Sequence, residues 1–259
     1  MPPSPRPAGH PAARPAARPA AHLAVIELRR YVLRPGRRDE LVELFDREFV
    51  ETQEAAGMTV LGQFRDLDDP DRFVWLRGFA DMETRREALS AFYGGPVWAA
   101  HGPRANATML DSDDVLLLRP LPAGSGFAVS PSERPPAGAA APDRFVAAAL
   151  WHFPPGDPDG AALVHDRLVP VLRETGPAPL AVLATEPAEN TFPRLPVRTG
   201  ENVVAVVTSY PDENAHRRHL AGVLGHPLVR QEILPRLAPA RGGAPELLRL
   251  TPTARSLVR

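Results

Sequence analysis

Two stretches of the chain decide its fold: VWLRGFADMETRREALSAFYGGPVW at residues 74–98 and AVVTSYPDENAHRRHLAGVLGHPLV at residues 205–229. They align without a gap. Phe79 then meets Tyr210, and the places where identical residues meet include Asp81 with Asp212, Arg86 with Arg217, Leu89 with Leu220 and Pro96 with Pro227. Upstream, the dipeptide at 35–36 meets a second Pro-Gly at 155–156. Internal repetition predicts two modules of one architecture.

The two copies also share a predicted order of elements. In the first copy, the spacing of apolar residues predicts a strand at 24–33, a helix at 38–56, strands at 59–65 and 73–79, and a helix capped by Asp81 that ends near 93. A further helical turn or two is expected at 97–106, and a last strand at 115–118. The corresponding segments of the second copy are 145–153, 161–174, 180–185, 202–210, 213–224 and 247–250. The order βαββαβ is that of ferredoxin-like domains.

This order predicts how the two modules combine. A four-stranded antiparallel sheet with both helices on one side leaves its other face bare, and two such sheets can bury these faces against each other. We therefore expect an α+β protein in which two ferredoxin-like modules, at 22–121 and 143–259, form an intramolecular α/β barrel. A Pro/Gly/Ala-rich linker is expected at 122–142 and a disordered Pro/Ala/Arg-rich tail at 1–21.

The composition limits the kinds of partner and chemistry that are open to this protein. The net charge of −1 gives no basic field for nucleic acid, and the absence of cysteine excludes disulfides and thiol nucleophiles. No apolar run is long enough to span a membrane, and the N-terminus lacks a secretory signal, so we expect a cytoplasmic protein. Because the two modules cover each other's faces, we expect a monomeric pseudo-dimer, although exposed sheet edges could still pair two chains.

Strand alternation singles out a polar set in the first copy. Ile26, Leu28 and Val32 fall on one side of the first strand and suit a helix-covered face. The opposite set would line the space between the sheets: Glu27, Arg29, Tyr31, Phe73, Trp75 and Arg77, with Gln63 and Arg65 from the second strand. Buried charges require pairing, so Glu27 is expected to pair with Arg29 or Arg77. The alternative is an ion-pair network that only holds the sheets together.

The second copy has no charged residues at the matching positions. Glu27, Arg29 and Tyr31 meet Ala147, Ala149 and Trp151, and the third strand offers valine and threonine instead of Trp75 and Arg77. One polar sheet and one apolar sheet would enclose a cavity that is polar on one side and apolar on the other. Such a cavity suits an apolar or aromatic small molecule that carries an anionic or carbonyl group.

A second group of candidates follows the helix that ends near residue 93. Trp98, His101 and Arg104 gather there, where His101 could act as general acid or base and Arg104 could hold an oxyanion. The alternative is that both side chains cap a helix C-terminus. His216 and His219 lie beside two arginines and indicate a solvated basic face. We expect neither a metal nor a cofactor, because no ligand spacing or Gly-rich phosphate loop is present.

Several segments of the first copy resemble the NIPSNAP family. They are Glu27-Leu-Arg-x-Tyr-x-Leu-x-Pro-Gly36, Gly62-Gln-Phe-Arg-Asp-Leu-Asp-Asp-Pro-Asp-Arg-Phe-Val-Trp-Leu-Arg-Gly-Phe79, Phe92-Tyr-Gly-Gly-Pro-Val-Trp-x-x-His101 and Asn106-Ala-Thr-Met109. The resemblance covers nearly all of the first copy and implies a barrel of the dimeric α/β superfamily. It implies no particular reaction. Related barrels include monooxygenases that need no cofactor, polyketide cyclases, isomerases and haem enzymes.

Two functional hypotheses follow. In the first, the protein is a metal-free enzyme of the cyclase, isomerase or cofactor-independent oxygenase type that acts on an aromatic or polyketide-like metabolite. Tyr31, His101 or Glu27 would move protons, and the other polar and aromatic candidates, including Trp98 and Trp151, would bind the substrate. In the second, the barrel is a non-catalytic module for small-molecule binding or protein assembly, and its polar set is structural.

Overall fold

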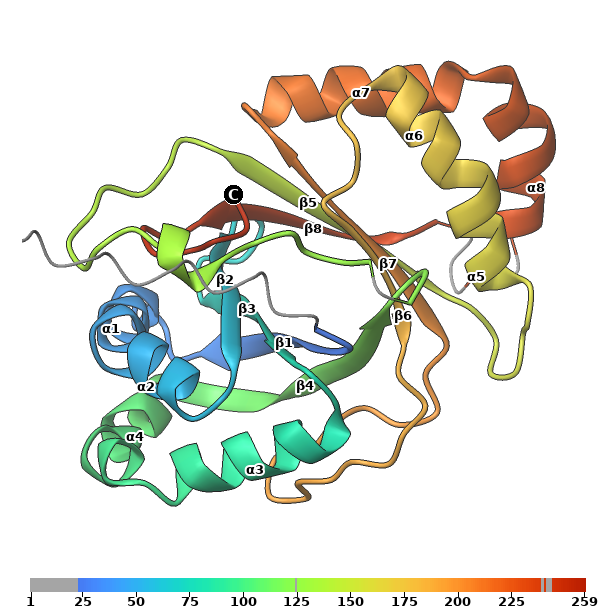
Figure 1. The fold of residues 1–259 in the computed structure, drawn as a ribbon. Helices are drawn as coiled ribbons and strands as arrows, with labels where there is room; N and C mark the ends of the chain where they lie inside the picture. The colour runs from blue at the N-terminus through green and yellow to red at the C-terminus, as the bar shows by residue number, and fades with distance from the viewer. Residues whose placement is uncertain (1–22, 124, 239, 241–243) are drawn as a thin grey trace, which may run out of the picture.

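The computed structural model describes residues 23–123, 125–238, 240 and 244–259, so the predicted tail at 1–21 lies outside the described residues. Within them, eight strands form one closed barrel in which neighbouring strands are antiparallel, in the order β1-β3-β2-β8-β5-β7-β6-β4 (Figure 1). The strands are β1 Val25–Leu33, β2 Thr59–Asp66, β3 Arg72–Phe79, β4 Met109–Pro120, β5 Phe145–His152, β6 Ala181–Thr185, β7 Val203–Tyr210 and β8 Glu246–Pro252. The predicted α+β barrel is confirmed.

Each half of the chain contributes four adjacent strands to the barrel. In the first half, residues 25–120, the order is β4-β1-β3-β2, and in the second half, residues 145–252, it is β6-β7-β5-β8. The halves join where β2 pairs with β8, as in Phe64 opposite Pro252, and where β4 pairs with β6, as in Leu118 opposite Thr185. Closure leaves no open sheet edge in the barrel.

The helices lie outside the barrel in two groups on opposite sides of it (Figure 1). The first half carries α1 Arg38–Leu44, the π-helical segment η1 Phe45–Phe49, α2 Val50–Ala55, α3 Met82–Tyr93 and α4 Pro96–Thr108. The second half carries α5 Gly160–Ala162, the π-helical segment η3 Leu163–Leu168, α6 Val169–Thr175, α7 Glu213–Gly225, the π-helical segment η4 Val229–Ile233 and α8 Leu234–Leu237. A 3₁₀ turn, η2 Pro131–Glu133, lies between the halves.

Local chemistry explains several helix boundaries. Asp81 begins α3 by accepting a hydrogen bond from the backbone N–H of Thr84 at 2.6 Å, and Asp212 begins α7 in the same way. The sequence predicted the cap at Asp81. It predicted only a turn or two at 97–106, whereas α4 runs for 13 residues, and it missed the segment from η4 to α8. Pro103 in α4 and the proline at the second position of α8 explain why both were hard to recognise.

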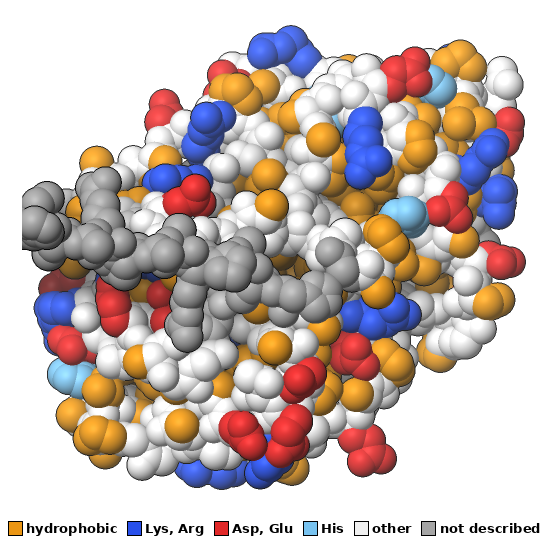
Figure 2. Space-filling model, viewed as in Figure 1, with side chains coloured by type: hydrophobic (Ala, Val, Ile, Leu, Met, Phe, Trp, Pro, Cys, Tyr) orange, Lys and Arg blue, Asp and Glu red, His pale blue; other side chains and the backbone are white. Residues whose placement is uncertain are grey.

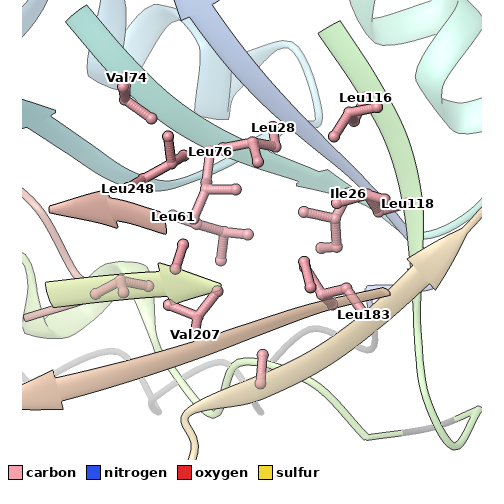
Figure 3. Close-up of a cluster of buried hydrophobic side chains, with 14 of the residues drawn as sticks. Ile26, Leu28, Leu61, Val74, Leu76, Leu116, Leu118, Leu183, Val207 and Leu248 are labelled. Atoms are coloured by element: carbon pink, nitrogen blue, oxygen red, sulfur yellow. The ribbon is translucent and has the colours of Figure 1, made fainter. Parts of the chain in front are cut away.

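Small aliphatic side chains from both halves fill the barrel interior (Figure 3). They include Ile26, Leu28, Leu61, Val74, Leu76, Leu116, Leu118, Leu183, Val207 and Leu248. The space left among them is about 10 Å³, roughly the volume that one water molecule needs. Phe127 of the predicted linker packs against the same cluster, while the predicted domain boundaries stay a prediction.

The predicted assignment of strand faces is wrong. The aliphatic set of β1 and β3 points into the barrel, and the set with Glu27, Arg29, Tyr31, Trp75 and Arg77 points to the helices. The physical reason is room, because an eight-stranded barrel is only just wide enough for side chains to fill. Arginine and tryptophan fit between sheet and helix instead. The predicted cavity between the sheets is therefore not formed by the described residues.

Candidate functional site

The polar set of the first half forms a buried ion cluster around Glu27. Arg29 Nη1 donates to Glu27 Oε2 at 2.7 Å, Arg77 Nε donates to the same oxygen at 2.8 Å, and Arg85 Nε donates to Oε1 at 2.6 Å. All four residues are at most 1% exposed. The expected pairing of Glu27 with the arginines of the strands is present, and Arg85 on α3 extends it to a helix. This Glu27 cluster, residues 27, 29, 77 and 85, ties β1 and β3 to α3.

The charges of the cluster keep Glu27 ionised. Burial alone would raise its pKa, but the three surrounding guanidinium groups more than offset this effect and hold the pKa well below its usual value. A carboxylate in this state has little tendency to take up a proton near neutral pH. The cluster contains three cations and one anion, and neutral groups contact some of its outer nitrogens, while Arg85 Nη2 has no hydrogen-bond partner among the described residues. Arg77 Nη1 contacts Gln53 Oε1 at 3.3 Å, and Arg85 Nη1 donates to Asn190 Oδ1 at 3.0 Å.

Aromatic rings fill the space beside this cluster. Tyr31, whose hydroxyl accepts from Arg29 Nε at 3.0 Å, lies edge-on to Trp75 with 6.0 Å between ring centroids. Phe45 packs against the other side of Trp75 at 4.9 Å, and Phe73 is completely buried next to them. The remaining space is about 20 Å³. Because an organic ligand does not fit there, the geometry favours a structural role for this set.

The other predicted residues of the first half do not gather into one site. Arg65 pairs with Asp39 at 2.9 Å, His101 lies 3.5 Å from Glu48, and Arg104 lies 3.1 Å from Glu40, all at the surface. Gln63 is completely buried, and Trp98 packs on Phe49 with 5.6 Å between ring centroids. His101 and Arg104 thus pair with carboxylates of α1 and η1. Their predicted roles in catalysis and binding stay predictions.

The second half contains a large cavity at the equivalent place, between the barrel and its helices. Its volume is about 350 Å³, and β5, β7, β8, α6, α7, η4 and α8 contribute to its wall. Ala147 and Ala149 line it where the first half has Glu27 and Arg29, and Thr208 lines it where the first half has Arg77. Replacing long charged side chains by small ones leaves this space open. An engineered apolar cavity of about 150 Å³ accommodates benzene, so this one has room for at least two fused rings.

Most of the wall is apolar, and its polar groups are concentrated at one place. Leucine, valine, alanine and proline residues together with Trp151 supply the apolar part, and Thr208, Tyr210, His216 and His219 supply the polar part. Tyr210 Oη lies 2.8 Å from His219 Nδ1. His216 stacks on Phe145, with 5.0 Å between ring centroids, and meets Tyr210 at 5.1 Å.

Hydrogen-bond partners fix the proton positions on the Tyr210–His219 pair. His219 Nε2 lies 3.0 Å from the carbonyl oxygen of Leu172, which can only accept, so Nε2 carries a hydrogen. It also lies 3.1 Å from Thr175 Oγ1, whose own hydrogen goes to a backbone carbonyl in α6. Burial lowers the pKa of His219, which keeps the ring neutral near pH 7 and Nδ1 unprotonated. Tyr210 therefore donates its hydrogen to His219, and its oxygen accepts from other groups.

The expectation of a solvated basic face around His216 and His219 is wrong. The two rings are 8% and 5% exposed and point to the cavity, whereas Arg217 and Arg218 between them are exposed. A helix face explains the difference, because residues 216, 219 and 223 recur at the spacing that turns to the sheet. That spacing is the signal in the sequence that the neighbouring arginines obscured.

The cavity opens to solvent through an apolar mouth. Leu220 and Leu224 on α7 and Leu234 on α8 line the cavity and are also 42%, 47% and 39% exposed. Hydrophobic side chains are visible among scattered charges on this face of the helices (Figure 2).

Among the described residues, no group of three or more His, Cys, Asp or Glu side chains is arranged to hold a metal ion. No described helix combines the length and the hydropathy needed to cross a membrane.

The fold, with one interface between barrel and helices in each half, defines the class of the protein. It is an α+β protein with a closed eight-stranded antiparallel barrel and helices outside it. Residues 26–124, which include the four strands of the first half except for Val25, match the family model described as NIPSNAP. A solved NIPSNAP family protein from Agrobacterium tumefaciens is 24% identical, with 38% of this chain and 87% of that chain covered and a TM-score of 0.36. A search of curated protein sequences found no match.

Two solved structures resemble the whole barrel. One is a protein from Lactobacillus acidophilus NCFM that was provisionally named a monooxygenase, with 13% identity, 92% of this chain and 99% of that chain covered, and a TM-score of 0.52. The other, from Fusobacterium nucleatum and named in the same provisional way, has 10% identity, coverage of 89% and 93%, and a TM-score of 0.56. At these identities the likeness concerns the fold alone.

Proposed function

We propose that this protein is a small-molecule enzyme that holds an aromatic or polyketide-like metabolite in the cavity of its second half and acts on it by acid/base chemistry. The observation that carries the proposal is the cavity of about 350 Å³ with apolar walls and one cluster of polar side chains. Binding pockets for organic molecules have this character. Monooxygenase chemistry of the kind named for the two similar barrels is one reaction that such a site could support.

The Tyr210–His219 pair supplies a route for the proton. When Tyr210 oxygen takes a proton from the bound molecule, the hydrogen of Tyr210 passes to His219 Nδ1, and the molecule is left as an anion. The imidazolium that forms keeps its Nε2–H bond to the carbonyl of Leu172. The reverse transfer returns the proton to the product, so the pair can act first as base and then as acid.

We also propose that the two halves are copies of one ferredoxin-like module. The support is their identical strand order and the matching registers, in which Glu27 lies opposite Arg77 as Ala147 lies opposite Thr208. In this view the first copy keeps a filled interface between sheet and helices, and the second copy has opened it for a ligand.

The experiment is metabolite profiling of a deletion strain that is complemented with different forms of the protein. A metabolite that accumulates in the deletion strain should disappear with the native protein and persist with Ala147→Phe, which fills the cavity, and with Tyr210→Phe. Ala221→Phe is the matched control, because the same substitution lies on the exposed side of α7 and outside the cavity.

Three other outcomes would change the proposal. If Ala147→Phe complements as well as the native protein while remaining folded by circular dichroism, the cavity is not the site. If the purified protein binds the metabolite without consuming it, the protein is a binding module. If Glu27 or Arg77 variants fail while folding normally, the chemistry belongs to the first half.

A further inference from the structure

The orientation of Tyr210 limits which molecules suit the cavity, and this inference rests on the function proposed above. Tyr210 has a single hydroxyl hydrogen, and His219 Nδ1 accepts it at 2.8 Å. Toward a bound molecule the phenolic oxygen can therefore act only as an acceptor. The orientation is stable because His219 is itself held in one tautomer by the carbonyl of Leu172 at 3.0 Å.

The packing of His219 fixes this arrangement further. Gly176 lies directly against the imidazole, so closely that a Cβ at residue 176 would be 2.5 Å from His219 Cδ2. Turning the ring over would place carbon atoms where Nδ1 and Nε2 now lie and would break its contacts with Tyr210 and Leu172. The pair is thus a fixed part of the wall, and the oxygen of Tyr210 can act there as an acceptor.

The rest of the wall contributes little that could bind a charged or strongly polar molecule. Among the described residues that line the cavity, none carries a carboxylate, guanidinium or ammonium group. Burial lowers the pKa of His216, so this ring is also neutral near pH 7, and Thr208 is the remaining polar side chain of the wall. A molecule that enters the cavity already charged would meet no fixed opposite charge among these residues.

We infer that the cavity selects neutral, mainly apolar ring compounds that carry a hydroxyl donor, that is phenols or enols, over ethers and ketones of the same shape. The donor hydrogen-bonds to Tyr210 oxygen, and the ring system fills the apolar part of the wall. This placement puts the acidic hydrogen of the ligand at the beginning of the proposed proton route. It thereby specifies the substrate class of the proposed enzyme.

The test uses three probes of similar size: naphthalene, 2-naphthol and 2-methoxynaphthalene. Their affinities for the full-length protein are measured by isothermal titration calorimetry at pH 7.5. We expect all three to bind, with 2-naphthol about fivefold tighter than the methyl ether, which corresponds to about 1 kcal/mol for one net hydrogen bond. In Tyr210→Phe the ratio should fall to about one, while the affinity for 2-methoxynaphthalene stays within about twofold.

Tyr93→Phe is the matched control, because it removes a tyrosine hydroxyl from the first half and should leave the fivefold ratio intact. Equal binding of 2-naphthol and its ether to the native protein would overturn the inference while leaving the binding cavity in place. A preference that persists in Tyr210→Phe would also overturn it, since the donor would then have another partner. If no probe binds, the inference and the proposed function both fail.

Discussion

Replacing Glu27 with glutamine should strongly destabilise the protein. The substitution preserves the shape of the side chain but removes the only negative charge of the Glu27 cluster. Arg29, Arg77 and Arg85 would remain in a region where none of them is more than 1% exposed. Each is now within 2.6–2.8 Å of a carboxylate oxygen. After the substitution they would repel one another without compensation.

The expected loss is large compared with the stability of a domain. Removing one partner of a buried ion pair costs about 3–5 kcal/mol, because the other charge is left buried and unpaired. Here a single carboxylate compensates three cations, so we expect the upper part of this range. The total free energy of unfolding of a typical domain is about 5–15 kcal/mol. Glu27→Gln should therefore lose a third or more of the stability.

The assay is equilibrium unfolding in urea at pH 7.5, followed by circular dichroism. Glu83→Gln on α3 is the matched control, because Glu83 pairs with Arg86 at the exposed surface, where such pairs contribute little. The control should unfold at the same urea concentration as the native protein. A loss of less than about 1 kcal/mol in Glu27→Gln, with an unchanged slope, would refute a structural role for the cluster. The hypothesis that Glu27 is catalytic would then regain support.

Three further results are expected. Gly176→Ala should force His219 to move and weaken 2-naphthol binding, whereas Gly222→Ala, whose Cβ would meet only ordinary contact at 3.7 Å, should raise thermal stability and leave binding unchanged. Burial lowers the pKa of His216 and His219, so the stability that is present above about pH 6.5 should be lost as the pH falls below that value. The urea midpoint of the native protein should fall over this range. The midpoint of a His216→Phe variant should fall less. Burial raises the pKa of Asp46 to about 6, so the contribution of Asp46 to stability has the opposite sign and is lost as the pH rises from about 4 to 6. Asp46→Asn should therefore be more stable than the native protein at pH 7.5. An unchanged urea midpoint of this variant would contradict this reasoning.

The sequence predicted the fold well because the signals for it are local and repeated. Alternation located β1, β3, β5 and β7 to within one or two residues, and the aligned acidic caps of α3 and α7 marked equivalent helices in the two halves. The order of elements then left few ways to bury the bare faces of two sheets. The segment from η4 to α8 was missed because prolines interrupt its pattern.

The sequence predicted which residues of β1 and β3 share a face, but it did not predict which face is inside. Alternation divides Glu27 and Arg29 from Ile26 and Leu28 without stating where each set points. The decision depends on the width of the closed barrel, which is a property of all eight strands together. The sequence predicted that Glu27 pairs with Arg29 or Arg77 and left a structural network as the alternative, and the position of this set against the helices required the structure.

The cavity was hidden because small residues carry little signal in a sequence. Ala147, Ala149 and Thr208 look uninformative one at a time, and only their positions opposite α7 give them meaning. Where a long side chain is replaced by a short one and the helix stays in place, the space remains. Tyr210 and His219 are nine residues apart and come from a strand and a helix, so their contact could not be recognised before the fold was known.

The two halves show that abundant polar residues and a ligand site need not coincide. In the first half, the interface between sheet and helices is filled by an ion cluster and aromatic rings, and about 20 Å³ remains there. In the second half, small side chains at the matching positions leave about 350 Å³, and the described residues of the wall carry no formal charge near pH 7. The filled interface of the first half can stabilise the closed barrel. The second half lacks the stabilisation that a filled interface between sheet and helices would give. A cavity of this size has a cost in stability, and we infer that binding a molecule there compensates for it.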